Sequence, residues 1–289
     1  MIEGGLYLVA TPIGNARDIT LRALDVLREA DILIAEDTRV LRKLMEIHGV
    51  ALNGRRLWSY HDHSKPADAA RIADLAGQGN AVAYCSDAGT PLVADPGFGL
   101  VLAARERNVP VTTVPGPSSV TTALALSGLA TDRFLFAGFV PRSGQARTGF
   151  LAELQDVAAT VVVFETAKRV QKLLDDLAES WGGTRRAALC RELTKKFEEV
   201  RTGPLSALAD QNRDDPARGE IVLVVERGEK ASLSEADVKR MLVDLMPDLS
   251  VRDAVDCVAK DADWPRKLVY RLALNLERDA DETTSPDRT

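Results

Sequence analysis

The stretch Leu6-Tyr-Leu-Val-Ala-Thr-Pro-Ile-Gly-Asn15 decides how the first part of this 289-residue chain folds. It opens with a continuous hydrophobic run, a pattern typical of a strand buried on both faces of a parallel sheet. Proline and glycine then break the run into a turn. No G-x-G-x-x-G follows the strand, and no G-x-x-x-x-G-K-[ST] occurs in the chain. The sequence therefore indicates an α/β fold and argues against the dinucleotide-binding and NTPase classes.

Short apolar runs and amphipathic stretches alternate from this first strand to about Val114. Leu21, Leu24 and Leu27 recur at helical spacing behind Asp18 and Thr20, either of which could cap a helix. The remaining expected elements are strands at Ile32–Ala35, Ala81–Cys85 and Val111–Val114, and helices from about Thr38 to Gly49 and from about Phe98 to Arg107. This region is predicted to be one α/β domain, residues 1–116.

A second α/β domain is predicted for residues 117–228. Its expected strands are Phe134–Ala137, Thr160–Phe164, Ala187–Cys190 and Ile221–Val225, and its expected helices are Ser119–Leu126, Ala167–Trp181 and Leu205–Gln211. The strands follow one another closely at the end, which favours a mixed sheet. The polar stretch Pro141-Arg-Ser-Gly-Gln-Ala-Arg147 is interpreted as a mobile loop.

After Gly228 the sequence predicts only helices, in a module spanning residues 229–289. The first helix starts at Ser234 and ends by Pro247, and Ser250 caps the second. Trp264-Pro265 opens the third, with Leu268, Leu272 and Leu276 expected on its inward face. Three short helices predict a helix-turn-helix-like module, and Glu282–Thr289 is expected to be a frayed tail.

The composition is that of a globular protein without a membrane anchor. Hydrophobic residues make up 45% and charged residues 28%, and no apolar run approaches the roughly 20 residues that span a bilayer. The start of the chain lacks the basic leader of a signal peptide. Cys85, Cys190 and Cys257 are far apart and lack metal-ligand spacing, which indicates a reduced, cytoplasmic location and no metal. A net charge of −6 argues against a simple polyanion binder, although a local basic patch remains compatible with it.

Four turns follow predicted strands, at the sheet edge where open α/β folds bind ligands. They are Thr11–Asn15, Glu36-Asp-Thr-Arg39, Ser86-Asp-Ala-Gly-Thr-Pro91 with Asp95-Pro-Gly97, and Pro115-Gly-Pro-Ser-Ser119. Asp87 could accept hydrogen bonds from a ribose or an amine. Ser118 and Ser119 open a helix, so their hydroxyls and the backbone N–H groups could bind a carboxylate. Any one of these is readily explained as a capped turn, but four together favour a cleft for a nucleoside ligand.

The same turns carry a resemblance to a known family. The matching motifs are Leu6–Asn15, Ala35-Glu-Asp-Thr-Arg39, His61-Asp-His63, Ser86–Pro91, Asp95-Pro-Gly97, Pro115-Gly-Pro117, Gly138-Phe139, Arg191-Glu-Leu-Thr-Lys195 and Gly219-Glu220. In this order they resemble the family of cytidine 2′-O-methyltransferases that act on small-subunit (16S) ribosomal RNA, within the tetrapyrrole methylase superfamily. The resemblance covers residues 6–226, and the helical tail is similar to an extension that many members carry.

This resemblance implies a two-domain tetrapyrrole-methylase-like fold, a methyltransferase outside the Rossmann class. It further implies S-adenosylmethionine in the cleft between the domains, a homodimer, and small-subunit ribosomal RNA as the substrate. The donor-binding positions that it implies are Pro12, Asp87, Ala88, Gly89, Ser118, Ser119, Glu165, Gly219 and Glu220.

Methyl transfer to a ribose hydroxyl requires alignment of the reacting atoms and a base for the hydroxyl proton. The candidate catalytic residues are Glu36, Arg39, His61, Glu165 and Lys195, with Asp37, His63 and Glu192 as further candidate bases, and the sequence does not select among them. The alternatives are a helix N-terminus for Glu36–Arg39, capped by Thr38, and a polar loop for His61. Lys195 could instead hold a phosphate.

Basic residues in three places are candidate RNA contacts. They are Arg142 and Arg147 in the polar loop, Arg191 and Lys195 after a strand, and Arg266, Lys267 and Arg271 in the tail. The alternative for the tail is a packing module with ordinary surface charge. Two other functions remain open: a methylase of the same fold acting on a small tetrapyrrole precursor, and a non-catalytic RNA-binding protein of ribosome assembly.

Overall fold

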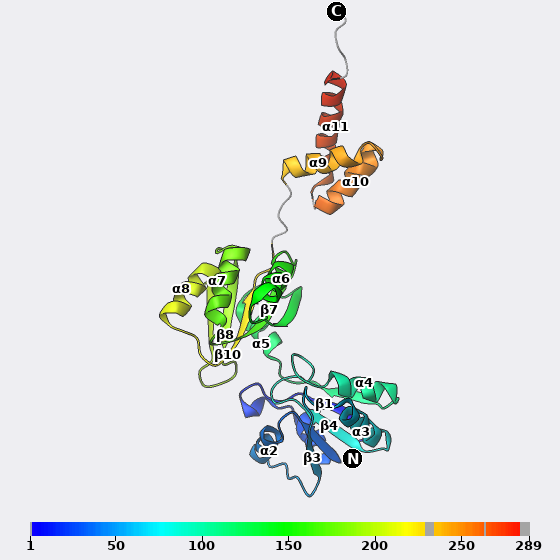
Figure 1. The fold of residues 1–289 in the computed structure, drawn as a ribbon, viewed down its shortest axis with the longest axis vertical. Coiled ribbons are helices and arrows are strands. Elements are labelled where there is room, and N and C mark those ends of the chain that lie inside the picture. The colour runs from blue at the N-terminus through cyan, green and yellow to red at the C-terminus, as the bar shows by residue number, and fades with distance from the viewer. Residues whose placement is uncertain (1, 229–233, 263, 284–289) are drawn as a thin grey trace, which may run out of the picture. The chain divides into compact units, whose positions relative to one another are not determined.

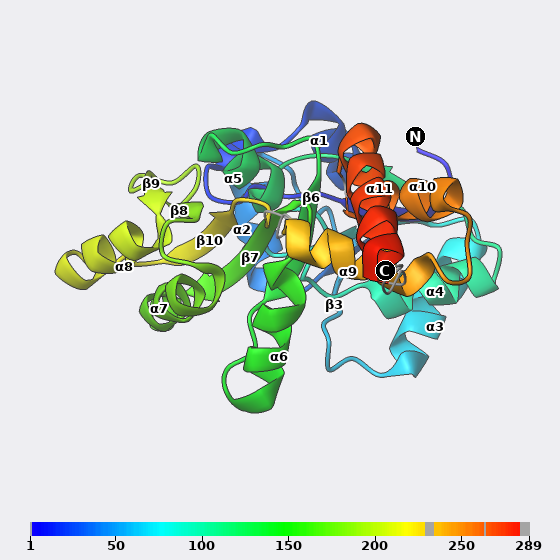
Figure 2. The ribbon, with the colours of Figure 1, turned by 90° about the horizontal axis from the view of Figure 1, so that it is seen from above.

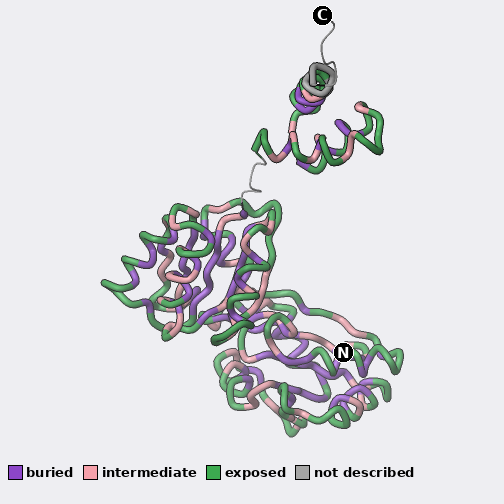
Figure 3. The backbone as a smooth tube through the Cα atoms, turned by 45° about the horizontal axis from the view of Figure 1, so that its top comes forward, coloured by how far each residue is buried: buried purple, intermediate pink, exposed green. Residues whose placement is uncertain are grey.

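A computed structural model describes residues 2–228, 234–262 and 264–283 (Figure 1). The chain forms two compact units, Met1–Gly228 and Glu229–Thr289. The first unit holds two five-stranded sheets, and the second holds three helices. Buried residues are concentrated along the strands of both sheets (Figure 3). We call the sheet β1 to β5 with its helices the first lobe, and the region from α5 to β10 the second lobe.

The first lobe is built on an entirely parallel sheet in the order β3-β2-β4-β1-β5. Its elements are β1 Gly5–Val9, η1 Ala16–Asp18, α1 Leu21–Glu29, β2 Ile32–Ala35, α2 Thr38–Ile47, β3 Arg56–Ser59, α3 Pro66–Gly77, β4 Ala81–Cys85, α4 Phe98–Glu106 and β5 Val111–Val114. Alternate strand residues pack against α1 and α2 on one face and against α3 and α4 on the other. Helices therefore cover both faces of the sheet, which confirms the prediction that its apolar strands are buried on both sides.

Several details of the first lobe differ from the sequence predictions, among them helix α3, which was not predicted. Strand β3 was not predicted, because its residues are only half-buried or exposed at the sheet edge and give no apolar run. The cap of α2 is Asp37 rather than Thr38, since the Asp37 carboxylate accepts a 2.8 Å hydrogen bond from the Arg39 N–H. At α1, Thr20 accepts a hydrogen bond from the Ala23 N–H and is therefore the cap.

The second lobe contains a mixed sheet in the order β6-β7-β10-β8-β9, as predicted from the strand spacing. Only β6 and β7 pair in parallel. Its elements are α5 Ser119–Ser127, β6 Phe134–Phe139, α6 Gly144–Gln155, β7 Thr160–Thr166, α7 Val170–Trp181, β8 Arg186–Arg191, β9 Glu199–Pro204, α8 Leu205–Asp214 and β10 Glu220–Val225. Helix α5 covers one face of the sheet, and α7 and α8 cover the other (Figure 2).

Two predictions for the second lobe were incomplete or wrong. Strand β9 was not predicted, because it is polar and lies at the edge of the sheet. The stretch from Pro141 to Arg147 was expected to be a mobile loop, but Gly144 begins helix α6. The reason is Arg147, which is only 4% exposed and holds the first turn of α6 against α7 through its ion pair with Asp176.

The C-terminal unit consists of α9 Glu235–Leu245, α10 Val251–Ala262 and α11 Arg266–Thr283, around a small core of its own. Ser234 caps α9 in a capping box with Asp237. Of the residues predicted on the inward face of α11, Leu272 is buried and Leu276 packs against the core, whereas Leu268 is exposed. Val269 and Ala273 are also buried there. The helix also continues to Thr283, so Glu282 and Thr283 are helical where a frayed tail was expected, and residues 284–289 of that expected tail lie outside the described part of the chain.

Within those described ranges, none of the helices is both long and apolar enough to cross a membrane.

Candidate functional site

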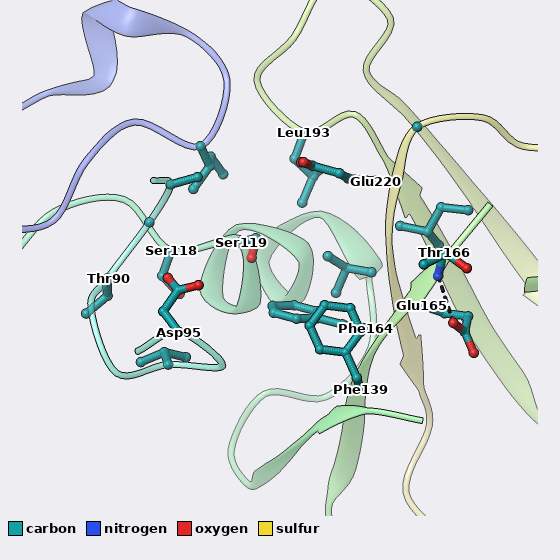
Figure 4. Close-up of a pocket in the computed structure, with 17 residues that line it drawn as sticks. Thr90, Asp95, Ser118, Ser119, Phe139, Phe164, Glu165, Thr166, Leu193 and Glu220 are labelled. Atoms are coloured by element: carbon teal, nitrogen blue, oxygen red, sulfur yellow. Dashed lines mark hydrogen bonds between the residues drawn. The ribbon is translucent and has the colours of Figure 1, made fainter. Parts of the chain in front are cut away.

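A cavity of about 320 Å³ lies between the two lobes of the first unit (Figure 4). The first lobe contributes Ile13, Ala88, Gly89, Thr90, Val93 and Asp95, and the second contributes Ser118, Ser119, Phe139, Phe164, Glu165, Thr166, Leu193, Gly219, Glu220, Ile221 and Val222. The first-lobe residues follow β1 and β4, and Ser118 and Ser119 follow β5, all at the carboxyl ends of parallel strands. This volume and the mixture of apolar and polar groups suit a small organic ligand.

Gly89 closes the floor of the cavity on the first-lobe side. Its backbone exchanges two hydrogen bonds with Thr11, at 2.9 and 3.0 Å, which ties the turn after β4 to the turn after β1. Gly89 has φ +80°, and a Cβ added there would lie 3.4 Å from the Ile13 Cγ2 atom. Glycine therefore permits both the left-handed backbone and the open space beside it.

Ser118 and Ser119 place a helix N-terminus at the cavity wall. Ser118 is the N-cap of α5, but its side chain accepts no capping hydrogen bond. The segment before it is fixed to the first lobe, because the Thr90 hydroxyl donates to the Pro117 carbonyl over 3.1 Å. The serine hydroxyls and the first N–H groups of α5 can therefore bind a carboxylate.

Two phenylalanines form the apolar side of the cavity. The Phe139 and Phe164 rings lie 5.4 Å apart at 69°, an edge-to-face arrangement. Phe139 is 55% exposed, which is high for a phenylalanine and leaves ring surface free for a ligand. A purine base or a thioether can pack against such a wall.

A strained loop of the second lobe completes the rim. Glu192 and Thr194 both have positive φ, at +50° and +65°. The Glu192 carboxylate accepts 3.0 Å hydrogen bonds from the Glu220 N–H and from Lys195 Nζ, and a Cβ at Gly219 would lie 2.2 Å from Glu192 Oε1. The Thr194 hydroxyl accepts a 3.0 Å hydrogen bond from the Asn15 N–H, so this loop joins the two lobes.

Carboxyl groups gather at the first-lobe end of the cavity. Burial, and then repulsion from Glu36 and Asp87, raises the pKa of Asp95 to about 7. Burial also raises the pKa of Glu36, with Asp87 adding to the effect. The Asp87 carboxylate accepts a 2.9 Å hydrogen bond from the Asp37 N–H. Asp95 is thus a carboxyl group that exchanges its proton near neutral pH.

Seven of the nine residues expected at the donor site line this cavity. They are Ala88, Gly89, Ser118, Ser119, Glu165, Gly219 and Glu220. Pro12 and Asp87 are not in the lining. The Asp87 side chain acts within the first lobe, where it holds the start of α2 through Asp37.

The structure separates the five candidate catalytic residues. Glu165 lies at the cavity, but its carboxylate points away from Ser118 and Ser119 (Figure 4) and pairs with Arg169 at 2.5 Å. The Glu165 side chain is fully buried and is held by this ion pair.

The prediction that Lys195 could serve as the base is not supported by its surroundings. Burial lowers its pKa, but hydrogen bonds to Glu220 and Glu192 outweigh this and raise the pKa above its usual value. A lysine held protonated in this way cannot accept the hydroxyl proton.

The other three candidates lie outside the cavity lining. The Arg39 side chain is 90% exposed and forms a 2.6 Å ion pair with Asp37. The Glu36 carboxylate accepts a 3.5 Å hydrogen bond from the Asp87 N–H. His61 is exposed and lines a separate cavity beside α3 and α4.

The prediction that Arg147 contacts RNA is wrong. The Arg147 side chain is only 5% exposed. Its Nε atom lies 2.7 Å from the Asp176 carboxylate and its Nη1 atom lies 3.7 Å from the Glu165 carboxylate. Arg147 therefore holds α6 in place and does not contact RNA. Arg191 pairs with Glu199 at 2.5 Å and is 23% exposed, which leaves it little capacity for a phosphate.

The remaining candidates lie on the surface. Arg142 is exposed before α6, and Arg266, Lys267 and Arg271 are exposed on α11. Arg266 pairs with Asp256, which leaves Lys267 and Arg271 as the exposed candidates of α11 outside that ion pair.

Several cavity residues were not among the predicted site residues, chiefly Asp95, Phe139 and Phe164. Asp95-Pro-Gly97 and Gly138-Phe139 were recognised as motifs without a role. The alternation of strand β7 could have identified Phe164, because even-numbered residues of this strand face α5 and the cavity while Val161, Val163 and Glu165 face α6 and α7.

No group of three or more histidine, cysteine or acidic side chains suited to a metal ion occurs within the described residues.

Comparison with known proteins identifies the family of the chain. Residues 5–209 match the model of the Tetrapyrrole (Corrin/Porphyrin) Methylases, and residues 232–277 match the RsmI C-terminal HTH domain. The chain is 45% identical over 278 residues to a "Ribosomal RNA small subunit methyltransferase I" of Mesorhizobium japonicum, covering 96% of this chain and 93% of that protein. A protein of the same name from Escherichia coli O157:H7 is 37% identical, covering 95% and 96%.

Solved structures show the same fold. The crystal structure of uroporphyrin-III-C-methyltransferase from Thermus thermophilus matches with a TM-score of 0.54 and 26% identity, over 78% of this chain and 94% of that one. Diphthine synthase matches with a TM-score of 0.61 over 92% and 99%, and at 19% identity this likeness concerns the fold alone. The fold, the two matched regions and the full-length relatives together establish that the chain belongs to the tetrapyrrole methylase family and, within it, to the ribosomal RNA small subunit methyltransferase I proteins.

Proposed function

We propose that this chain transfers the methyl group of S-adenosylmethionine to the 2′-oxygen of a cytidine in small-subunit (16S) ribosomal RNA. The observation that carries the proposal is the inter-lobe cavity, whose lining suits this methyl donor, in a chain whose full-length relatives are named ribosomal RNA small subunit methyltransferase I. A non-catalytic RNA-binding protein would have no use for such a cavity.

The chemistry of the lining fits each part of the donor. The wall of Phe139 and Phe164 offers an apolar surface for the adenine and the thioether carbons. Ser118 and Ser119 at the start of α5 suit the carboxylate. The acidic group of Glu220 suits the ammonium group. S-adenosylmethionine supplies an electrophilic methyl group, and the residues of the chain hold and orient it.

Glu192 acts through its neighbours. By accepting hydrogen bonds from the Glu220 N–H and from Lys195, it fixes the backbone at Gly219 and Glu220 where they border the cavity. Pre-organising such a rim reduces the entropy lost when a ligand binds. Ala88 and Gly89 fix the opposite rim through the Thr11 bridge.

The experiment that tests the function is methyl transfer from labelled S-adenosylmethionine to purified small ribosomal subunits that lack the modification. We expect incorporation of label, and we expect nuclease and alkaline digestion of the RNA to leave an alkali-resistant 2′-O-methylcytidine linkage. Transfer to a tetrapyrrole precursor, with none to subunits or free RNA, would overturn the proposal in favour of a small-molecule methylase.

RNA contact is proposed for Arg142 and for the cations of α11. Replacement of Lys267 and Arg271 together by alanine is expected to weaken RNA binding and to reduce the slope of log Kd against log salt by about 2, because each lost phosphate contact removes about one unit. The measurement is a filter-binding titration over a salt series. Lys239→Ala/Arg240→Ala is the charge-matched control, since both cations already pair with acids on α9. Equal slopes for the two double variants would remove α11 from the RNA surface.

A homodimer and a cytoplasmic location are also proposed. The edge strand β6 exposes Phe134 and Leu135, apolar side chains that suit a contact between protomers. All three cysteines are free thiols, which suits a reducing compartment. Light scattering after gel filtration tests the dimer, since a mass of 31.3 kDa would show a monomer instead.

A further inference from the structure

A second cavity, with a volume of about 730 Å³, lies beside α3 and α4. It is lined by the turn after β3, including His61 and Asp62, and by the start of α4, including Phe98. Among the described residues that line the two cavities, Asp95 is the one common to both. Its carboxyl group therefore stands between the donor site and a second, larger space.

The fold holds Asp95 at this junction by several contacts. The preceding residues Leu92 and Ala94 have positive φ, +72° and +60°, a conformation that side-chain-bearing residues adopt at an energetic cost. Immediately after Asp95, the Pro96 carbonyl accepts a 2.9 Å hydrogen bond from the buried Tyr84 hydroxyl. A Cβ at Gly97 would lie 2.9 Å from the Tyr84 ring. The loop is thus fixed against the core of the first lobe on both sides of the carboxyl group.

The second cavity has the chemistry of a nucleotide site. Phe98 is 74% exposed at its edge, and an unstacked base can pack on an exposed aromatic ring. The Asp62 carboxylate can accept a hydrogen bond from the exocyclic amine of cytosine, a group that uracil lacks. A base seated beside Phe98 and Asp62 would bring its ribose towards Asp95.

We propose that the second cavity receives the target cytidine and that Asp95 is the general base that takes its 2′-hydroxyl proton. The proposal rests on the methyl transfer proposed above and deepens it. In the step, the 2′-oxygen forms a bond to the methyl carbon while the bond from that carbon to sulfur breaks, and the sulfur keeps the electron pair. The hydroxyl proton passes to the Asp95 carboxylate. The products are the 2′-O-methyl ribose, S-adenosylhomocysteine and a protonated Asp95.

The surroundings of Asp95 match this role. Burial is the main cause of its raised pKa, and Glu36 after β2, Asp87 after β4 and Asp62 after β3 add to the effect, while a hydrogen bond from Ser86 lowers the pKa. The elements around it also carry the titratable or charged groups Tyr60, His61, Tyr84, Glu106 and Arg107. Tyr84 stays neutral because burial raises its pKa well above the usual range. With a pKa of about 7, the carboxylate is a far stronger base than an ordinary aspartate and is still half ionised at neutral pH.

The test is Asp95→Asn, which keeps the size of the side chain and removes the base. We expect the single-turnover rate on small subunits to fall by about 10²–10⁴-fold. The dissociation constant of S-adenosylhomocysteine, measured by calorimetry, should change far less. For the wild type, log(kcat/KM) should rise with pH below about 7 and level off above it, because only the ionised carboxylate accepts the proton. The variant should lose this dependence.

Two further variants separate the base from its neighbours. Phe98→Ala should raise KM for the subunits more than it lowers kcat, because the ring binds the nucleotide and takes no part in proton transfer. Asp25→Asn, an exposed change of the same kind on α1, should behave as the wild type. If Asp95→Asn keeps more than a third of the wild-type rate, or keeps its pH dependence, Asp95 is not the base.

A readout independent of activity is thermal stability. Because the folded-state pKa of Asp95 is raised, its ionisation disfavours the fold as pH rises from the unfolded value through about 7. Asp95→Asn should therefore raise the Tm more at pH 8 than at pH 5. An equal effect at both would show that the carboxyl group is not in the environment described. Failure of the wild type to methylate cytidine would instead reject the proposed function.

Discussion

Gly89→Val is expected to weaken binding of the methyl donor by more than about 100-fold, which corresponds to about 2.7 kcal/mol. Two effects add up. Valine is a β-branched residue and strongly disfavours the φ of +80° that this position requires. Its methyl groups would also project beside Ile13 into the space that the ligand needs. Calorimetric titration with S-adenosylhomocysteine measures the change, and single-turnover methylation should fall with it.

Gly128→Val is the matched control for the backbone effect. Gly128 has φ +67°, and a Cβ there would have no heavy atom within 4 Å. This substitution imposes similar strain without entering the cavity. We expect it to lower the Tm while leaving donor affinity within about threefold of the wild type. Equal affinities for the two variants would mean that the cavity beside Gly89 does not hold the donor.

Arg147→Met is expected to lower the free energy of unfolding by about 3–5 kcal/mol, the cost of breaking a buried ion pair by removing one partner. Methionine fills much of the space of the arginine stem but leaves Glu165 and Asp176 without this cation. Glu165 keeps its 2.5 Å pair with Arg169, which limits the loss. Urea unfolding followed by circular dichroism measures the change.

Lys172→Met provides the control on the same carboxylate. Lys172 pairs with Asp176 at 3.0 Å, but its side chain is 66% exposed, so the pair contributes at most about 1 kcal/mol. A loss as small for Arg147→Met as for Lys172→Met would contradict the structural role of Arg147.

The sequence predicted the central strands of both sheets and the edge strands β5 and β6, and it missed the edge strands β3 and β9. Strands such as β4 and β10 are buried on both faces, and burial leaves a continuous apolar run. Strands β3 and β9 lie at sheet edges with exposed residues, so their pairing depends on a neighbour that is distant in the chain. The local sequence pattern of an edge strand therefore does not indicate which strand it pairs with.

The site was predictable where a single turn carries the chemistry, as at Gly89 and Ser118. It was not predictable where the direction of a side chain decides the role. Glu165 and Phe164 are adjacent in sequence, but strand alternation turns one to the buried ion pairs and the other to the cavity. Arg147 appeared in a polar stretch, and only packing of α6 against α7 shows that it is buried.

The order β6-β7-β10-β8-β9 also determines when the second lobe can assemble during translation. Strand β10 is its central strand, with hydrogen bonds to both β7 and β8, but it is the last of the five to be synthesised. The first lobe can close its sheet once β5 has left the ribosomal tunnel, about 110 residues earlier in the chain. Until β10 emerges, β7 and β8 lack the strand that pairs with both of them, and their apolar residues cannot be buried in a complete sheet. The nascent chain therefore passes through an interval in which this half is open to aggregation or to chaperones.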